Sequence, residues 1–181
     1  MKKSITRKTT VGVVDTDVLA FTAGKDVQLD LVLAEADCLG SAAHVIMLSR
    51  LPMKPALFNA TECRKVLGVL GEIARTAQAG KFKIRLEDQD VHLAVERTLT
   101  EQLGDLGKRV HTGRSRNDQV ALDLRLYARG ELVAALEETA ALALTLLAFG
   151  NGVQRIAMEG RTHMQPGMPS SVGLWATAFT E

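Results

Sequence analysis

The segment from Asn117 to Phe149 constrains the fold more than any other part of the sequence, because its apolar residues recur with the period of an α-helix. At 1.5 Å per residue this predicted helix is about 50 Å long. Its second half is apolar nearly all round, so it needs several partner helices, and this chain has too few to supply them. The pattern therefore predicts one long helix of a helical bundle. Its stripe comprises Val120, Leu124, Tyr127, Ala128, Leu132, Ala135, Leu142, Leu146 and Phe149.

Three shorter helices are predicted on the N-terminal side of this segment. Residues 30–50 have apolar and small residues at near-helical spacing, and the two prolines that follow lack the N–H that a continued helix needs. Asn59 or Thr61 can cap a second helix that runs toward Gly80. Residues 87–102, with an apolar residue at every fourth position, predict the third.

The two ends of the chain carry less regular patterns. Residues 11–14 are compatible with a short strand or an extended arm. Residues 150–152 (Gly-Asn-Gly) are expected to end the long helix, and residues 159–165 to form a polar turn. A last apolar run covers residues 172–179, and no glycine, proline or capping residue follows it before Glu181. This pattern predicts a chain truncated within a helix.

Composition supports an all-α fold. Apolar residues make up 46% of the 181 residues but aromatic residues only 4%, so Leu, Ala and Val must supply the packing, and unbranched side chains lose little rotamer freedom in a helix. We predict a small helical N-terminal domain over residues 1–110. Residues 111–181 are predicted to be the truncated start of a central helical-bundle domain, with its first long helix and part of the next.

Charge and hydropathy argue against several classes of protein. The formal net charge is +1, whereas a duplex-binding protein usually has a basic excess, so no nucleic-acid partner is expected. Residues 132–149 are apolar enough to suggest a membrane span. However, Glu137 and Glu138 near its middle would each cost about 2.5–3.5 kcal/mol, which favours a buried bundle helix and no membrane partner. Cys38 and Cys63 have no nearby His or Cys and are expected to be reduced thiols of a cytoplasmic protein.

The run HTGRSRNDQ at residues 111–119 places hydroxyls, two guanidinium groups and an amide directly before the long helix. The first N–H groups of a helix lack intrahelical partners and carry the positive end of its dipole, so donors in the preceding loop form a natural carboxylate site. Arg116 could hold a carboxylate bidentately, with Ser115 and Asn117 as neutral donors. The alternative is a polar turn in which Ser115 or Asn117 caps the helix.

A second polar cluster is GRTHMQ at residues 160–165. His163 could exchange a proton near neutral pH, and Thr162 and Gln165 could orient a bound oxygen. The alternative is a structural or solvated histidine in a turn.

Asp88, His92 and Glu96 follow one another at four-residue spacing, on the helical face opposite the apolar stripe. They could begin a metal site, but no further cluster of ligands supports one. We therefore expect a solvated polar face and no metal.

The segment from Leu86 to Leu126 contains Glu87-Asp88, Val91-His92 and then the HTGRSRNDQV run at residues 111–120. It resembles argininosuccinate lyase and its lens relative delta-crystallin, of the aspartase/fumarase superfamily. The run is long and unusual enough to be highly specific. A weaker similarity begins at Asp30 and includes Leu33, Asp37, Gly40 and Ser41, and a moderate one covers Thr162-His163, Gln165 and Pro169. The similarity extends over most of the chain after about residue 25.

The resemblance implies a mainly helical homotetramer whose active sites are each assembled from three subunits, without metal or organic cofactor. The family's reaction is a β-elimination of argininosuccinate to arginine and fumarate in arginine biosynthesis. A base removes a proton beside a carboxylate, and fixed donors stabilise the charge that collects there. The resemblance implies that His163, with Thr162, is catalytic and that His92 lines the pocket. By family position, the groups that bind the dicarboxylate substrate are Ser115, Arg116, Asn117, Thr162 and Gln165.

The sequence departs from the family pattern in several places. The family's third motif, a glycine- and serine-rich mobile loop with the serine assigned as catalytic base, lies beyond Glu181, so this chain alone is expected to be inactive. Asp26 stands where the family usually has a substrate-binding serine, and an acid there would repel a dicarboxylate unless a cation compensates. Arg161 replaces the usual tyrosine, and residues 166–167 (Pro-Gly) depart from the usual basic pattern.

Two classes of function follow. The leading hypothesis is a lyase component, either a fragment or half of a split enzyme that a separate C-terminal chain completes. The alternatives are a non-catalytic, crystallin-like binding protein of the same fold, or a superfamily lyase that releases fumarate from a different substrate. Nucleic-acid binding through Arg114 and Arg116 is disfavoured by the neutral charge balance and the scarcity of aromatic residues.

Overall fold

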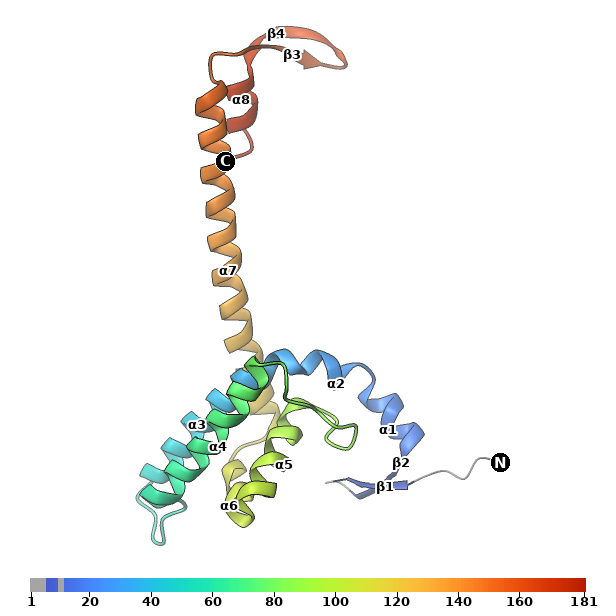
Figure 1. Cartoon of the computed structure of the whole chain (residues 1–181), viewed down its shortest axis with the longest axis vertical. Coiled ribbons are helices and arrows are strands. Elements are labelled where there is room, and N and C mark those ends of the chain that lie inside the picture. The colour runs from blue at the N-terminus through green and yellow to red at the C-terminus, as the bar shows by residue number, and fades with distance from the viewer. Residues whose placement is uncertain (1–5, 10–11) are drawn as a thin grey trace, which may run out of the picture. The chain divides into compact units, whose positions relative to one another are not determined.

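The structure, a computed structural model, describes residues 6–9 and 12–181, with side chains from Asp15 onward. Most of these residues are helical, which confirms the predicted fold class, although two short hairpins are also present. The backbone divides into two compact units, Met1–Ala128 and Arg129–Glu181 (Figure 1). We describe each unit by itself.

The N-terminal unit begins with a two-stranded hairpin. β1 (Thr6–Thr9) pairs antiparallel with β2 (Gly12–Asp15). The strand expected at residues 11–14 is therefore present from Gly12, while Val11 lies outside the described residues. The side chain of Asp15 then accepts two backbone N–H groups at the start of α1 (Thr16–Ala23), which is the usual way to satisfy the first donors of a helix.

Two consecutive elements fill the region of the helix predicted over residues 30–50. These are the 3₁₀ turn η1 (Asp30–Leu33) and α3 (Ala34–Arg50), and the short α2 (Asp26–Leu29) precedes them. The helix predicted over residues 30–50 is thus confirmed, except that its first turn is wound more tightly than an α-helix.

The next helix, α4 (Ala60–Gln78), has a capping box. Asn59 Oδ1 accepts the N–H of Glu62 at 2.9 Å, and Glu62 Oε2 accepts the N–H of Asn59 at 2.9 Å. Of the two residues that could cap this helix by sequence, Asn59 is therefore the one that does so. The predicted apolar stripe of α4 is buried, and it comprises Val66, Val69, Leu70 and Ile73.

The third helix, α5 (Val91–Leu103), starts four residues later than predicted. Asp90 is its cap and accepts the N–H of Leu93 at 2.8 Å. Gln89 has a positive φ of 69°, which a continuing helix does not allow. Residues 87–90 therefore form a turn, and Asp88 precedes α5 instead of lying on it.

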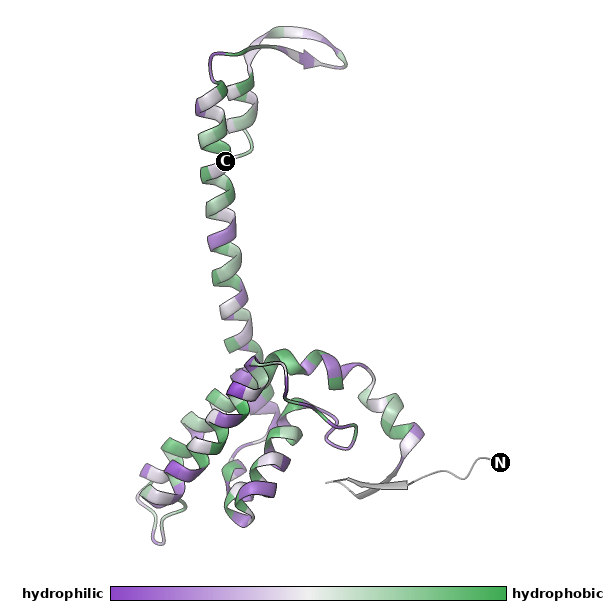
Figure 2. Cartoon of the chain, viewed as in Figure 1, coloured by the Kyte–Doolittle hydropathy of each residue, from purple (hydrophilic) through white to green (hydrophobic). Residues whose placement is uncertain are grey.

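The core of the N-terminal unit lies where α3, α4 and α5 pack together, as Figures 1 and 2 show. The short α6 (Asp105–Lys108) and the 3₁₀ turn η2 (Arg109–His111) then bring the chain to the last helix. Gly107 allows a very close approach to α5, because a Cβ at this position would lie 2.5 Å from the carbonyl oxygen of Leu99.

The long helix is α7 (Arg116–Val153), which is longer than predicted. The Gly-Asn-Gly sequence at residues 150–152 does not end it. A Cβ on Gly150 would lie 2.7 Å from Thr177 Cγ2, and one on Gly173 would lie 2.6 Å from Gln154 Cα. These glycines therefore allow α8 (Val172–Thr177) to pack closely against the end of α7, and they serve packing rather than termination.

The predicted polar turn at residues 159–165 is instead a hairpin of β3 (Ala157–Thr162) and β4 (Gln165–Ser171). His163 and Met164 alone form its turn, with φ of 50° and 61°. Positive φ at both central residues is typical of a type I′ hairpin turn, which is most often signalled by Asn-Gly, and that signal is missing here. The last helix also ends earlier than the apolar run, at Thr177.

Two helical segments contain stretches that are long and apolar enough to cross a membrane: Asp26–Arg50 and Arg116–Val153, with mean hydropathies of 1.6 and 1.8. The first is half buried, as the core helix of a globular domain is. The apolar window of the second is not buried in this chain (Figure 2). Its apolar residues are therefore left without the partner helices that the sequence predicted they need. Its exposed large apolar residues include Leu132, Val133, Leu136, Leu142, Leu144 and Phe149.

Candidate functional site

An open cavity of about 550 Å³ lies beside the first turns of α7 in the N-terminal unit. Three of the predicted site residues, Asp26, Arg116 and Asn117, line it. The cavity therefore lies next to the sequence motif that carried the functional prediction. Its remaining lining residues are Thr22, Ala23, Asp30, Leu33, Gln89, Asp90, Val91, Val120, Asp123 and Leu124.

The start of α7 is capped by the protein's own side chains. Ser115 Oγ accepts the N–H of Asn117 at 3.1 Å, and Asp118 Oδ2 accepts the N–H of Ser115 at 3.0 Å. Ser115 is thus the cap that the sequence offered as an alternative, although its hydroxyl can still donate its own proton. Asp118 places a negative charge at the positive end of the helix dipole, so the dipole favours a ligand carboxylate less than the sequence suggested.

Arg116 is held in the cavity wall by an ion pair with Asp90. One carboxylate oxygen of Asp90 accepts from Arg116 Nη2, and the other accepts the N–H of Leu93 in the cap of α5. Asp90 therefore ties the start of α5 to the start of α7. A guanidinium has five N–H donors, and the pair with Asp90 uses the nitrogen Nη2.

The cavity lining is rich in acids, with four aspartates (Asp26, Asp30, Asp90 and Asp123) beside the single Arg116. Burial raises the pKa of the Asp30 carboxyl, and the negative charge of Asp26 raises it further, while the N–H of Val91 and the charge of Arg116 act in the opposite direction. Such a lining suits a ligand that carries a cationic group as well as a carboxylate.

His92 is almost fully buried between helices. Its Nδ1 lies 2.9 Å from Asp37 Oδ2, and its ring meets that of His111 edge-on at 4.2 Å between centroids. His92 lies outside the described residues that line the cavity. Its role as a pocket histidine remains a prediction.

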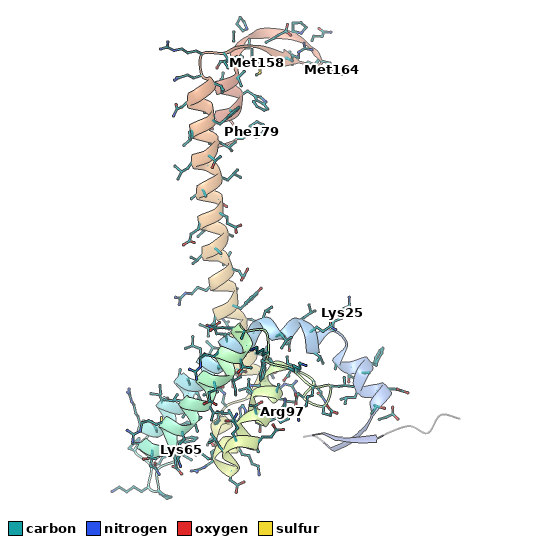
Figure 3. The ribbon with its side chains drawn as sticks, viewed as in Figure 1. Lys25, Lys65, Arg97, Met158, Met164 and Phe179 are labelled. Atoms are coloured by element: carbon teal, nitrogen blue, oxygen red, sulfur yellow. The ribbon has the colours of Figure 1, made fainter. Side chains whose placement is uncertain are left out.

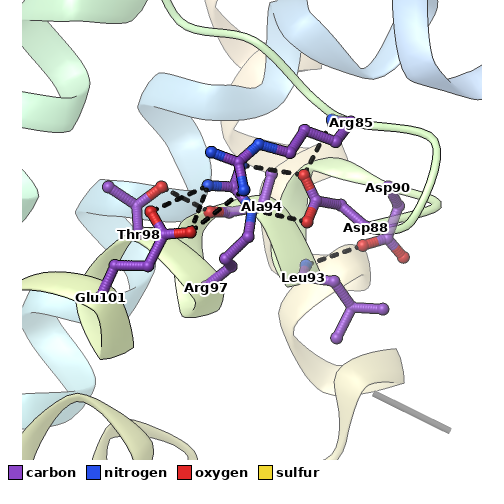
Figure 4. A network of polar contacts seen from close by, with 8 residues as sticks. All are labelled: Arg85, Asp88, Asp90, Leu93, Ala94, Arg97, Thr98 and Glu101. Atoms are coloured by element: carbon purple, nitrogen blue, oxygen red, sulfur yellow. Dashed lines mark hydrogen bonds and ion pairs between the residues drawn. The ribbon is translucent and has the colours of Figure 1, made fainter. Parts of the chain in front are cut away.

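The prediction that Asp88, His92 and Glu96 form a solvated polar face is wrong. Asp88 and His92 are both buried, and Asp88 accepts from Arg97 Nε at 2.7 Å and Nη2 at 2.9 Å, as Figure 4 shows. The four-residue spacing failed because Asp88 lies in the turn before α5, where its carboxylate turns toward Arg97. Among the residues that the structure describes, no group of three or more His, Cys, Asp or Glu side chains is placed to hold a metal ion.

Thr162, His163 and Gln165 belong to the C-terminal unit, where they lie together at the tight end of the β3–β4 hairpin. Thr162 pairs with Gln165 across the two strands, and His163 and the 95% exposed Met164 form the turn (Figure 3). All three predicted residues are exposed. Their catalytic and binding roles remain predictions.

The sequence had not singled out Gln89, Asp90 and Asp123 as site residues. A signal existed for Asp90, since an aspartate directly before an apolar helical run is a frequent N-cap. Asp123 follows Gln119 by four residues and so shares its helical face, but nothing in the sequence indicated that this face is buried.

Comparisons with known proteins show which family this chain belongs to. Residues 14–181 match the family described as lyase. The chain is 44% identical over 168 residues to the argininosuccinate lyase of Phocaeicola vulgatus and 43% identical over 168 residues to that of Parabacteroides distasonis, covering 93% of this chain and 37% of each relative. The chain thus spans little more than a third of the length of these relatives.

Among solved structures, the chain is similar to a fumarate lyase:delta crystallin from Brucella melitensis in native form. The TM-score is 0.66 at 17% sequence identity, over 98% of this chain and 46% of that one. At this identity the likeness concerns the fold.

Proposed function

The chain belongs to the lyase family, and from this premise we propose that it supplies the N-terminal part of an argininosuccinate lyase. Two relatives that bear this name are 43–44% identical to it over 168 residues, which are 93% of its length. The proposed reaction is the β-elimination of argininosuccinate to arginine and fumarate, a step of arginine biosynthesis in the cytoplasm.

The observation that carries this proposal is the mixed charge of the cavity beside α7. Argininosuccinate has carboxylates at one end of the molecule and a guanidinium group beside them, so it needs both a cation and anions in its site. Arg116 and the N–H donors of Asn117 suit a carboxylate, whereas Asp26 and Asp30 suit a cationic group. A substrate with carboxylates alone, such as that of a fumarase-type relative, would be repelled by these acids.

In the proposed reaction, a base removes a proton from the carbon beside a carboxylate, and the bond between the neighbouring carbon and the guanidinium nitrogen breaks. The electron pair of the broken bond goes to that nitrogen, which takes up a proton. Fixed donors stabilise the charge that collects on the carboxylate. We assign this role to Ser115, Arg116 and Asn117 of the N-terminal unit. For the hairpin of the C-terminal unit, we propose that Thr162 and Gln165 bind substrate and that His163 transfers a proton.

The proposal extends to assembly. Leu136 and Leu144 on α7 are 70% and 67% exposed, and a protein surface rarely leaves so many large apolar side chains uncovered. We propose that residues 111–181 contribute to the central bundle of a homotetramer and residues 1–110 to its N-terminal domain. Turnover is proposed to require the part that the relatives carry in addition to this chain.

The test is fumarate release from argininosuccinate, measured with this chain alone and together with the remaining part of the Phocaeicola vulgatus relative. We expect turnover from the mixture only. Arg116→Leu in the mixture is expected to abolish turnover while leaving assembly intact, because it removes the cation of the cavity.

The matched control is Arg125→Leu. Arg125 lies on the same helix, is exposed, and its Nη1 donates to the backbone carbonyl of Ala121, away from the cavity lining. Equal turnover of the two variants would contradict the proposed site. Binding of arginine or succinate without any turnover would favour a non-catalytic protein of the same fold.

A further inference from the structure

The junction of α3 and α7 in the N-terminal unit is unusually close. A Cβ on Gly40 would lie 2.9 Å from Leu122 Cδ2 and 3.1 Å from Gln119 Nε2. A larger residue at position 40 would therefore have to displace the side chains of Leu122 and Gln119. The start of α7, which carries the cavity residues Arg116 and Asn117, is held against α3 at this point.

Polar side chains reinforce the junction. Gln119 is fully buried, and its Nε2 donates to the backbone carbonyl of Asp37 at 3.0 Å and to Asp123 Oδ1 at 2.9 Å. One amide group thus joins α3 to two consecutive turns of α7. Asp37 and Asp123 are themselves fully buried, although a buried carboxylate is costly unless it is paired or protonated.

The two carboxyl groups differ in their support. Asp37 Oδ2 lies 2.9 Å from His92 Nδ1, and Asp37 Oδ1 accepts from Ser41 Oγ at 3.5 Å. Asp123 Oδ1 accepts from the amide of Gln119, and Asp123 Oδ2 has no donor within the described part of the chain, so the remaining side-chain contact of Asp123 is with the Asp37 carboxyl. Asp123 therefore has fewer hydrogen-bond donors than Asp37, and it is the member of the pair that takes a proton.

Electrostatics agree with this division. Burial raises the pKa of the Asp123 carboxyl to about 8, and the negative charge of Asp37 contributes, although Arg114 and Gln119 oppose the rise. Cys38, whose pKa burial raises to about 12, and His111, whose pKa burial lowers to about 4, keep their protonation states between pH 7 and pH 9. Among the described residues, the titratable and charged side chains that act on the pair are Cys38, His92, His111 and Arg114.

We propose that Asp37 and Asp123 form a buried carboxyl pair that holds one proton at neutral pH and, through Gln119, positions the first turns of α7. Asp123 is a positioning residue, since it acts on Arg116 and Asn117 through the helix that carries them. When the proton leaves, two negative charges face each other in a buried space, and their repulsion loosens α7 from α3. Only the consequence for the ligand cavity rests on the proposed function; the proton and the junction do not.

The first experiment is an infrared titration of this full chain between pH 6 and pH 9.5. A protonated carboxylic acid has a C=O stretch well separated from that of a carboxylate. We expect such a band at pH 7, and we expect it to vanish with a midpoint near pH 8. It should be missing from Asp123→Asn and present in the control Asp105→Asn, since Asp105 is an exposed acid of the same unit.

The second experiment is amide hydrogen exchange at residues 115–119, corrected for the intrinsic effect of pH. In the wild type and in Asp105→Asn, exchange should rise about tenfold from pH 7 to pH 9, since one pH unit beyond the pKa corresponds to a factor of ten. Asp123→Asn, which keeps a neutral group of the same shape, should show no such rise.

The absence of a protonated carboxyl at pH 7 in the wild type would overturn the proposal even if the variant did not fold. An equal rise of exchange in Asp123→Asn and the wild type would overturn the positioning role. Neither measurement uses substrate, so either failure would leave the lyase proposal untouched, and failure of fumarate release would leave the carboxyl pair untouched.

Discussion

Replacing Asp88 with alanine should destabilise the N-terminal unit more than any other single truncation of an acid in the network of Figure 4. Asp88 is 4% exposed and has three donors: Arg97 Nε at 2.7 Å, Arg97 Nη2 at 2.9 Å and the N–H of Arg85 at 2.8 Å. The pair raises the pKa of the Arg97 guanidinium, first through the hydrogen bond with Asp88. All three contacts disappear together in the variant.

The magnitude follows from what is left behind. The Arg97 side chain is only 22% exposed, so its charge would lose a partner in a partly dry site, and its bond with Glu101 at 3.3 Å is longer. Breaking a fully buried ion pair costs about 3–5 kcal/mol. Because Arg97 retains some contact with water, we expect about 3 kcal/mol, which corresponds to a fall in Tm of roughly 6–12 °C for a chain of this length.

The assay is urea unfolding followed by circular dichroism, with Asp105→Ala as the control. Asp105 also pairs with a cation, Lys108, at 2.9 Å, but the carboxyl is 92% exposed. Exposed pairs contribute little, so no measurable change is expected there. If the free energy of unfolding of Asp88→Ala were within error of that of the control, burial would not be what makes the Asp88–Arg97 pair stabilising.

Three further predictions use the same structure. Gly107→Ala should lower the stability of the N-terminal unit by about 2–4 kcal/mol in thermal melts, because its Cβ would clash with backbone atoms of α5. The control Gly68→Ala has open space around the new methyl group and should raise the stability of this unit by up to about 1 kcal/mol. Burial lowers the pKa of His111 to about 4, so the unfolded chain binds a proton that the folded chain refuses, and stability falls as the pH drops from 6.5 toward 4. His111→Gln should lessen that fall by about 2 kcal/mol in urea titrations at pH 4.5, and an unchanged slope would contradict the assignment. His163→Asn should slow fumarate release from the completed enzyme by about 100-fold or more without altering its assembly, and unchanged kinetics would remove His163 from the mechanism.

Most of the helical architecture was predictable because it depends on local patterns. The apolar stripe of α4 and its cap at Asn59 are both visible in the sequence, and both are present in the structure. The hairpin of β3 and β4 was not predictable, since His163 and Met164 adopt positive φ without the glycine that usually signals such a turn. The end of α7 was predicted too early because Gly150 resembles a helix stop signal. In the structure this glycine instead leaves room for the side chain of Thr177.

The site was predictable in its motif but less so in its surroundings. The run at residues 111–119 indicated donors at the start of a helix, and the structure places Arg116 and Asn117 at a cavity. Three of the acids around them, Asp26, Asp30 and Asp90, come from distant parts of the chain, and only folding brings them to the start of α7. The burial of Asp88 and His92 could not be inferred either, because four-residue spacing gives the shared face of a helix and says nothing of which neighbour covers it.

The position of Arg116 depends on two acids that act from opposite sides. Asp90 holds the guanidinium from the side of α5 with one carboxylate oxygen, and its other oxygen caps that helix through the N–H of Leu93. From the other side, Gln119 ties α7 to α3 through the backbone carbonyl of Asp37, and Asp123 accepts from the same amide. A ligand carboxylate that competes for Arg116 would therefore compete with the ion pair that joins α5 to α7. Because three further aspartates line the cavity, we expect a ligand that also carries a cationic group to bind there more tightly than one with carboxylates alone.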